Sequence, residues 1–187
     1  KWAKVDITRI AMGHTVAVTA LQMLNMICCI GNDGFLMKNH IVRKVVDKDG
    51  VVLFENKPEA VSRPITERTA ALMRQMLMEV TREGGTGTRA TIPGFNVAGK
   101  TGTAEKIQDG RYVHNANVSS FMGIFPAERP EIGIVVVLDN PQPLRTGGVT
   151  AGPVFAQIAE PVARYLDIQP VNATEMGYYQ RMLEDEP

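Results

Sequence analysis

The sequence has few of the residues that build metal sites and disulfides. Its three histidines, His14, His40 and His114, stand apart without ligand partners at short spacing, so we expect no metal site. The two cysteines, Cys28 and Cys29, are adjacent in the apolar stretch LQMLNMICCI. Because neighbouring cysteines rarely pair without strain, we expect two small buried hydrophobic residues on a helix.

An excess of charge and a long hydrophobic run are also missing. Lys plus Arg and Asp plus Glu balance at 20 each, so no nucleic-acid partner is expected. No apolar stretch approaches the roughly 20 residues that span a bilayer, and the opening KWAKVDITRI does not read as a signal peptide. We therefore expect a soluble chain, as a piece of a longer protein would also be.

The 187 residues, 44% of them hydrophobic, suffice for one domain with its own core. Capping residues and apolar spacing predict helices from Thr19 to Gly31, from Thr66 to about Arg82 and from about Thr150 to Leu166. The second helix is expected to turn Met73, Met76, Leu77 and Val80 toward the core. The third is expected to pack Val154, Phe155, Ile158 and Val162 on the sheet. Pro161 predicts a kink or two shorter helices.

Strand patterns fill much of the remaining chain. HIVRKVVDKDGVVLFENK predicts a hairpin around Asp49 and Gly50. FNVAGKTGTAEKI, NVSSFMGIFPA and EIGIVVVLD predict three consecutive strands with short links, and hence an antiparallel meander whose last strand is central or covered by helices. The fold class is therefore α+β, an antiparallel sheet flanked by helices, with residues 169–187 as a tail.

The stretch GFNVAGKT, from Gly94 to Thr101, matches the G-x-x-x-x-G-K-[ST] pattern of a phosphate-binding loop. Such a loop needs a buried strand before it and a helix after it. Here the preceding EGGTGTRATIP is rich in turn residues, and the turn QDG follows too soon for a helix. A nucleotide-binding hydrolase therefore remains only as the alternative.

Considered as a strand, the same stretch directs Lys100 and Gly102 to one side and Thr101 and Thr103 to the other. Gly99 and Gly102 would let a ligand backbone approach the strand edge closely. A cation and hydroxyl groups along such an edge suit a peptide that ends in a carboxylate and adds itself as an extra strand.

AGKTGTAEK resembles the lysine-threonine-glycine motif of penicillin-binding proteins and serine β-lactamases. GHTVAVTALQML, EGGTGTRATIPGFNVAGKTGTAEK, SSFMGIFPAERPEIGIVVVLDNP and TGGVTAGPVFAQIA resemble, in this order, the C-terminal half of the transpeptidase domain of class B penicillin-binding proteins. The resemblance covers about residues 1–169. It implies that residues 1–168 form the C-terminal portion of a transpeptidase domain, within the β-lactamase and penicillin-binding fold.

The resemblance implies a serine acyltransferase without a cofactor. Its substrate would be a peptidoglycan stem peptide ending in D-Ala-D-Ala, which β-lactam antibiotics mimic. Lys100 would supply positive charge and join the proton network of the nucleophile. Thr101 and Thr103 would bind the terminal carboxylate, the Thr103 N–H would complete the oxyanion hole, and Gly102 would leave room for the substrate.

The family also needs the motifs S-x-x-K and S-x-N, and the serines of this chain, Ser62, Ser119 and Ser120, fit neither. Ser119 and Ser120 lie in a strand pattern with no base nearby, which favours a structural role. We therefore expect a fragment, inactive alone, that needs the missing N-terminal part of the same domain. Its parent would be anchored in the bacterial inner membrane and face the periplasm or cell exterior. A fold relative that binds without catalysing is the other explanation.

Overall fold

The computed structural model describes residues 13, 16–108 and 111–170. His14, most of the predicted tail and part of the predicted QDG turn lie outside these residues. At the centre is an antiparallel sheet of three strands, β5 (Ala98–Gln108), β6 (Arg111–Phe125) and β7 (Ile132–Asp139), in the order β5-β6-β7. The predicted meander is confirmed.

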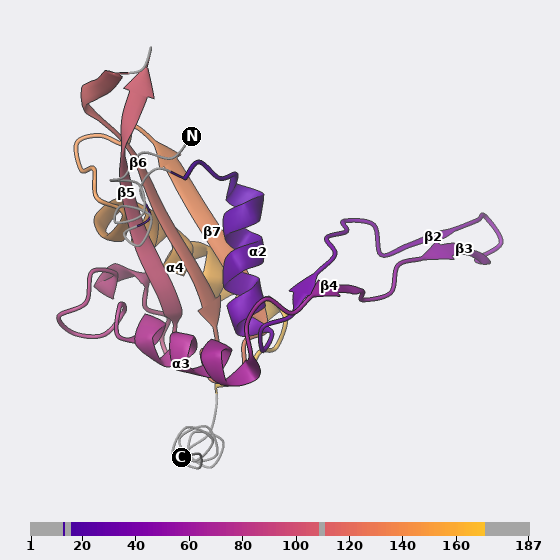
Figure 1. The fold of residues 1–187 in the computed structure, drawn as a ribbon. Coiled ribbons are helices and arrows are strands. Elements are labelled where there is room, and N and C mark those ends of the chain that lie inside the picture. The colour runs from indigo at the N-terminus through magenta and orange to yellow at the C-terminus, as the bar shows by residue number, and fades with distance from the viewer. Residues whose placement is uncertain (1–12, 14–15, 109–110, 171–187) are drawn as a thin grey trace.

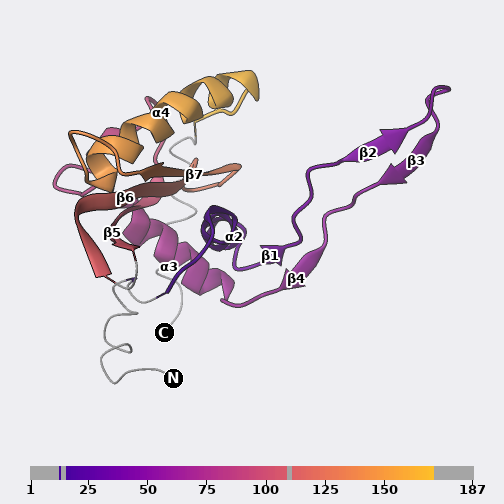
Figure 2. The ribbon, with the colours of Figure 1, turned by 90° about the horizontal axis from the view of Figure 1, so that it is seen from above.

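Helices cover both faces of the sheet (Figures 1 and 2). One face carries α4 (Gly147–Tyr165), and the other carries α2 (Ala20–Gly31) and α3 (Glu67–Met78). Strand β7 contacts both α2 and α4, so its apolar character on both faces follows from helix cover rather than from a central position. This arrangement confirms the α+β class. No helix in the described ranges is long and apolar enough to cross a membrane.

Two separate hydrophobic cores hold these layers together. Between the sheet and α4, the buried rings of Phe121 and Phe155 meet edge to face with centroids 4.8 Å apart. Between the sheet and the pair α2 and α3, Ile27 and Ile124 are buried with Met73 and Leu77 packed against them. The sheet is therefore apolar on both faces where the helices cover it, as was predicted for its last strand.

The helix starts follow from local chemistry. Thr19 caps α2 in a capping box, in which the Gln22 N–H donates to Thr19 Oγ1 (3.2 Å) and the Thr19 N–H donates to Gln22 Oε1 (2.8 Å). Thr66 caps α3 by accepting from the Thr69 N–H at 3.1 Å. The first two predicted helices are thus confirmed from their first residue, although α3 ends at Met78 rather than near Arg82.

The predicted inward faces need two corrections. Met76 is 65% exposed, because the side of α3 that meets the core runs through Ala70, Met73 and Leu77. Ile158 is 43% exposed, because alanines at the neighbouring positions of α4 let the helix approach the sheet closely. Spacing alone fits either stripe, and in α4 the stripe that packs is the one with the smaller residues.

Of the two outcomes predicted at Pro161, a kink or two shorter helices, the structure excludes the second. Helix α4 runs as one element, begins at Gly147 rather than Thr150, and contains Pro161. The proline lies on the exposed side, where water can satisfy the carbonyl of Gln157 that its missing N–H leaves without a donor.

An extended ribbon joins α2 to α3 and projects from the body (Figures 1 and 2). Its base pairs β1 (Leu36–Met37) with β4 (Ala60–Ser62), and its outer part pairs β2 (Lys44–Val46) with β3 (Val52–Glu55). The hairpin predicted around Asp49 and Gly50 is confirmed as this outer part.

Candidate functional site

The stretch Gly94–Thr101 does not form a phosphate-binding loop. Before it lies only the short 3-10 helix η1 (Thr88–Ala90), and from Ala98 onward the chain is strand β5, which continues to Gln108. No helix N-terminus follows Thr101, so the group that supplies most of the anion binding in such loops is missing. The structure gives no support to the nucleotide-binding alternative.

Lys100 lies on β5 opposite Met122 of β6, with an exposed side chain. Its Nζ donates to the carbonyl oxygen of Thr101 at 2.9 Å. Lys100 also lines an apolar groove formed largely by α2 and α3, so its side chain is on the face of the sheet that these helices cover. Because β5 pairs only with β6 among the described strands, the outer edge of the lysine-bearing strand is open.

Thr101 and Thr103 lie on the opposite side of β5, beside the start of α4. The hydroxyl oxygen of Thr101 is 2.9 Å from that of Thr86, and Thr103 Oγ1 accepts a hydrogen bond from the Gly147 N–H at 3.1 Å. Gly147 is the first residue of α4, whose N-terminus carries partial positive charge. Since Thr103 Oγ1 already accepts, its O–H proton is available to a ligand. Two hydroxyl groups and a helix N-terminus together suit a carboxylate.

This close approach of α4 to β5 depends on glycines. A Cβ on Gly147 would lie 2.2 Å from the carbonyl oxygen of Ser120 and 2.3 Å from that of Gly102. A Cβ on Gly148 would lie 1.9 Å from the carbonyl oxygen of Thr86. Any larger residue would force these backbones apart, so the pair of glycines keeps the helix N-terminus against the strand.

Sequence reasoning missed Thr86 and this glycine pair. The stretch EGGTGT that contains Thr86 indicated only the end of a helix, and Gly147 and Gly148 were assigned to the loop before α4. Two glycines where a long helix begins are a usable signal of close approach. The position of Thr86 beside Thr101 depends on how the loop after α3 folds back onto the sheet, which no local pattern specifies.

The serines have structural surroundings. Ser119 is fully buried, and its hydroxyl donates to the carbonyl of Arg145 in the loop before α4. Ser120 stands opposite Gly102 on the neighbouring strand, where its Oγ occupies the space that a Cβ on Gly102 would need. Ser62 lies exposed on β4 of the projecting ribbon. The structural role expected for Ser119 agrees with its hydrogen bond.

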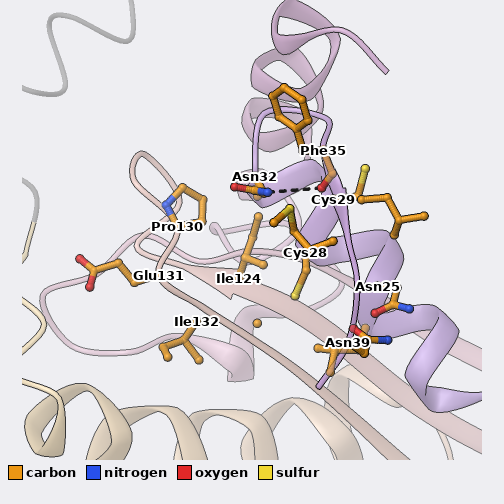
Figure 3. A pocket seen from close by; sticks show the side chains of 15 residues that line it. Asn25, Cys28, Cys29, Asn32, Phe35, Asn39, Ile124, Pro130, Glu131 and Ile132 are labelled. Carbon is orange, nitrogen blue, oxygen red and sulfur yellow. Dashed lines mark hydrogen bonds between the residues drawn. The ribbon is translucent and has the colours of Figure 1, made fainter. Parts of the chain in front are cut away.

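A separate cavity of about 350 Å³ lies at the C-terminal end of α2 (Figure 3). It is lined by both cysteines, of which Cys29 is buried and Cys28 half-buried. Burial raises the pKa of both thiols, and the neighbouring Cys29 raises that of Cys28 further. Both thiols are therefore protonated and weakly nucleophilic at neutral pH. Lys100, Thr101, Gly102 and Thr103 do not line this cavity. Within the described part of the chain, no three potential metal ligands cluster.

Residues 1–160 match the family model described as penicillin binding protein transpeptidase domain. The probable peptidoglycan D,D-transpeptidase PenA of Neisseria flavescens is 32% identical over 171 residues, which are 91% of this chain and 40% of that protein. The peptidoglycan D,D-transpeptidase FtsI of Escherichia coli is 31% identical over 172 residues, 91% of this chain and 27% of that protein.

Two solved structures agree in fold. Penicillin-binding protein 3 of Mycobacterium tuberculosis, complexed with aztreonam, superposes with a TM-score of 0.81 at 32% identity, over 92% of this chain and 40% of that one. The transpeptidase domain of Burkholderia pseudomallei penicillin-binding protein 3 superposes with a TM-score of 0.75 at 29% identity, over 92% of this chain and 50% of that one. The chain thus spans half or less of each of these relatives.

Proposed function

The chain belongs to the penicillin-binding protein transpeptidase family, and we propose that its parent is a serine D,D-transpeptidase that cross-links peptidoglycan stem peptides. In the proposed reaction a serine Oγ attacks the carbonyl of the penultimate D-alanine and passes its proton on to the departing D-alanine amine. The amine of a second stem peptide then attacks the acyl-enzyme, forms the cross-link and releases the serine. A β-lactam would acylate the same serine.

The observation that carries the proposal is the arrangement of groups along β5. Lys100 stands on one face of an open-edged strand, and the Thr101 and Thr103 hydroxyls stand beside the N-terminus of α4 on the other. An extended peptide that adds itself to this edge would place its terminal carboxylate near the two hydroxyls. The Thr103 N–H would then stabilise the oxyanion, and Gly102 would leave space for the peptide backbone.

Thr86 has a positioning role in this proposal. Its hydroxyl lies 2.9 Å from that of Thr101, so it can accept or donate and thereby fix the direction of the Thr101 proton. With Thr101 held in this way, the carboxylate would meet a donor that is already oriented, which lowers the entropic cost of binding.

The nucleophile of this reaction has no candidate in the chain, which contains neither S-x-x-K nor S-x-N. It would come from the N-terminal part of the same domain, so the chain alone would be inactive. The parent would be anchored in the inner membrane with this domain outside the cytoplasm, where its substrate is found. No cofactor takes part in the acyl transfer.

Labelling with a fluorescent penicillin tests the proposal. The parent protein should form a stable covalent adduct, and the isolated chain should not. In the parent, Lys100→Ala should reduce the labelling rate at least about 100-fold, the usual scale for a lost proton-transfer group. Lys106→Ala is the matched control, because Lys106 lies on the same strand but pairs with Asp139 at 2.7 Å. An unlabelled parent, or equal labelling of both variants, would refute the assigned roles.

A further inference from the structure

The outer part of the projecting ribbon has no cover among the described residues. Strands β2 and β3 pair only with each other, and two views show them clear of the helices and of the central sheet (Figures 1 and 2). Every residue of both strands is exposed, yet most are apolar: Val45, Val46, Val52, Leu53 and Phe54. Because a two-stranded hairpin is only marginally stable in water, a further strand would stabilise the ribbon.

Of the two edges of this hairpin, the edge of β2 is the regular one. Strand β3 is bulged at Leu53, since Val45 faces Phe54 while the next residue, Val46, faces Val52. A bulge twists an edge and so hinders the addition of another strand. A strand is therefore expected to add to β2 rather than to β3.

Strand β2 also presents free backbone groups at this edge. The carbonyl oxygen of Arg43 and the N–H of Asp47 form hydrogen bonds toward the β3 side of the ribbon, at 2.8 and 3.0 Å. Backbone groups of an antiparallel strand point to alternate sides from one residue to the next. The N–H and C=O groups of Lys44 and Val46 therefore point away from β3.

We propose that β2 pairs with β2 of a second copy of the parent, antiparallel and about a two-fold axis at Val45. In this register the free groups of Lys44 meet those of Val46 of the other copy. Arg43 lies opposite Asp47 of the other copy at both ends, so two pairs of opposite charge flank the axis. The product is a closed pair of molecules joined by a four-stranded sheet.

The two neighbouring registers, which use the same free groups, fit less well. An axis at Lys44 would place the two copies of this lysine directly opposite each other, which is destabilising. An axis at Val46 would place Lys44 opposite Lys48, and this repulsion would offset the attraction between Arg43 and Asp49. Charge complementarity therefore selects the central register and supports a second copy as the partner.

The same register also joins apolar surface. Val45 and Phe54 are direct partners in the hairpin, so they lie on one face, and the pairing continues this face from one copy to the other. The turn of one ribbon would reach the level of residues 40–42 of the other, where Ile41 is fully exposed. Because this level lies outside the base strand β1, the two bodies stay apart.

Disulfide cross-linking of the parent tests the register. Two copies of Val45 would face each other in a non-hydrogen-bonded pair with Cα atoms about 4.5 Å apart, which a disulfide can span. Two copies of Val46 would be diagonal neighbours about 7–8 Å apart, beyond that reach. These positions are matched in exposure, at 44% and 47%. Under mild oxidation, Val45→Cys should therefore give at least about tenfold more cross-linked dimer than Val46→Cys.

Non-reducing electrophoresis reads the result, and the wild type gives the background from the native cysteines. Equal cross-linking of the two variants, or none, would overturn the inference. So would a cross-link at Phe54→Cys in place of Val45→Cys, because Phe54 would lie on the axis of a pair formed through β3.

A charge reversal tests the same interface without oxidation. Arg43→Glu should weaken the dimer of the parent at least about tenfold in sedimentation, because two like-charge pairs replace two of opposite charge. Lys57→Glu makes the same change of net charge at an exposed position after β3 and should stay within about twofold of the wild type. Equal urea midpoints would show that both variants keep the fold. A wild-type parent that sediments as a monomer, or equal dimerisation of the two variants, would overturn the inference, which does not depend on the proposed reaction.

Discussion

Gly147→Ala should separate the N-terminus of α4 from strand β5 and so disturb the proposed carboxylate site. The added Cβ would lie 2.2 Å from the carbonyl oxygen of Ser120 and 2.3 Å from that of Gly102. An ordinary contact is near 3.4 Å, so the backbones must move apart by about 1 Å. Because both obstacles are main-chain atoms of the central sheet, no side-chain rotation relieves the clash.

The cost can be estimated from two effects. Overpacking of this kind lowers the free energy of unfolding by about 3 kcal/mol, the upper end of the usual range, because a rigid sheet gives little. A displacement of about 1 Å in a catalytic arrangement can also reduce the rate by about 100-fold. The same displacement would lengthen the hydrogen bond from the Gly147 N–H to Thr103 Oγ1, which is 3.1 Å in the wild type.

Gly152→Ala is the matched control in the same helix. Its Cβ would find nothing closer than the Ala90 nitrogen at 3.5 Å, an ordinary contact, and alanine favours helix by up to about 1 kcal/mol. Urea unfolding of the chain and the rate of penicillin labelling of the parent are the assays. If Gly147→Ala unfolds at the same urea concentration as Gly152→Ala and is labelled as fast, the close approach of α4 does not matter in the way described.

Three further predictions concern other parts of the molecule. Thr86→Val should slow penicillin labelling of the parent about tenfold, because Thr101 loses the hydroxyl group that orients it. Thr91→Val, at an exposed position, should leave the labelling rate unchanged, and equal rates for the two variants would show that Thr86 is not part of the site. Arg74→Met should lower the free energy of unfolding by about 2 kcal/mol, because the buried Ile30 carbonyl loses its hydrogen-bond donor at 2.9 Å. Arg82→Met removes an exposed ion pair and should lower it by under about 0.5 kcal/mol, so similar urea midpoints for the two variants would contradict this. The pKa of the Cys28 thiol is raised in the folded state, so its contribution to stability is complete below the unfolded value of about 9 and is lost as the pH rises through the folded value. The wild type should therefore lose stability above pH 9 more steeply than Cys28→Ala, and parallel curves of stability against pH would contradict this prediction.

Local chemistry was sufficient to predict most of the secondary structure. The caps at Thr19 and Thr66, the turn at Asp49 and Gly50, and the alternation through Lys100 each depend on residues within a few positions of one another. For the same reason the phosphate-loop match could be rejected from its neighbours, since the strand and helix it needs must lie next to it in the chain.

The inward faces of the helices were less predictable. Met76 and Ile158 fit a helical stripe as well as the residues that are buried, because several stripes share one spacing. What decided between them was the fit of each helix against the sheet, in which α4 approaches through alanines and α3 through Met73 and Leu77. Pro161 likewise indicated a kink or two shorter helices, and the exposure of its side of α4 accounts for the helix continuing as one element.

By itself, the sequence determined the strand that carries Lys100, Thr101, Gly102 and Thr103, and the resemblance that those residues and their neighbours support. Only the tertiary structure brought Thr86 and Gly147 to that strand, from 15 and 44 residues away along the chain. It also left one face of an uncharged helix open beside Lys100. Such contacts arise from packing between distant segments, whose free energy depends on shape in three dimensions and leaves no periodic trace in the sequence.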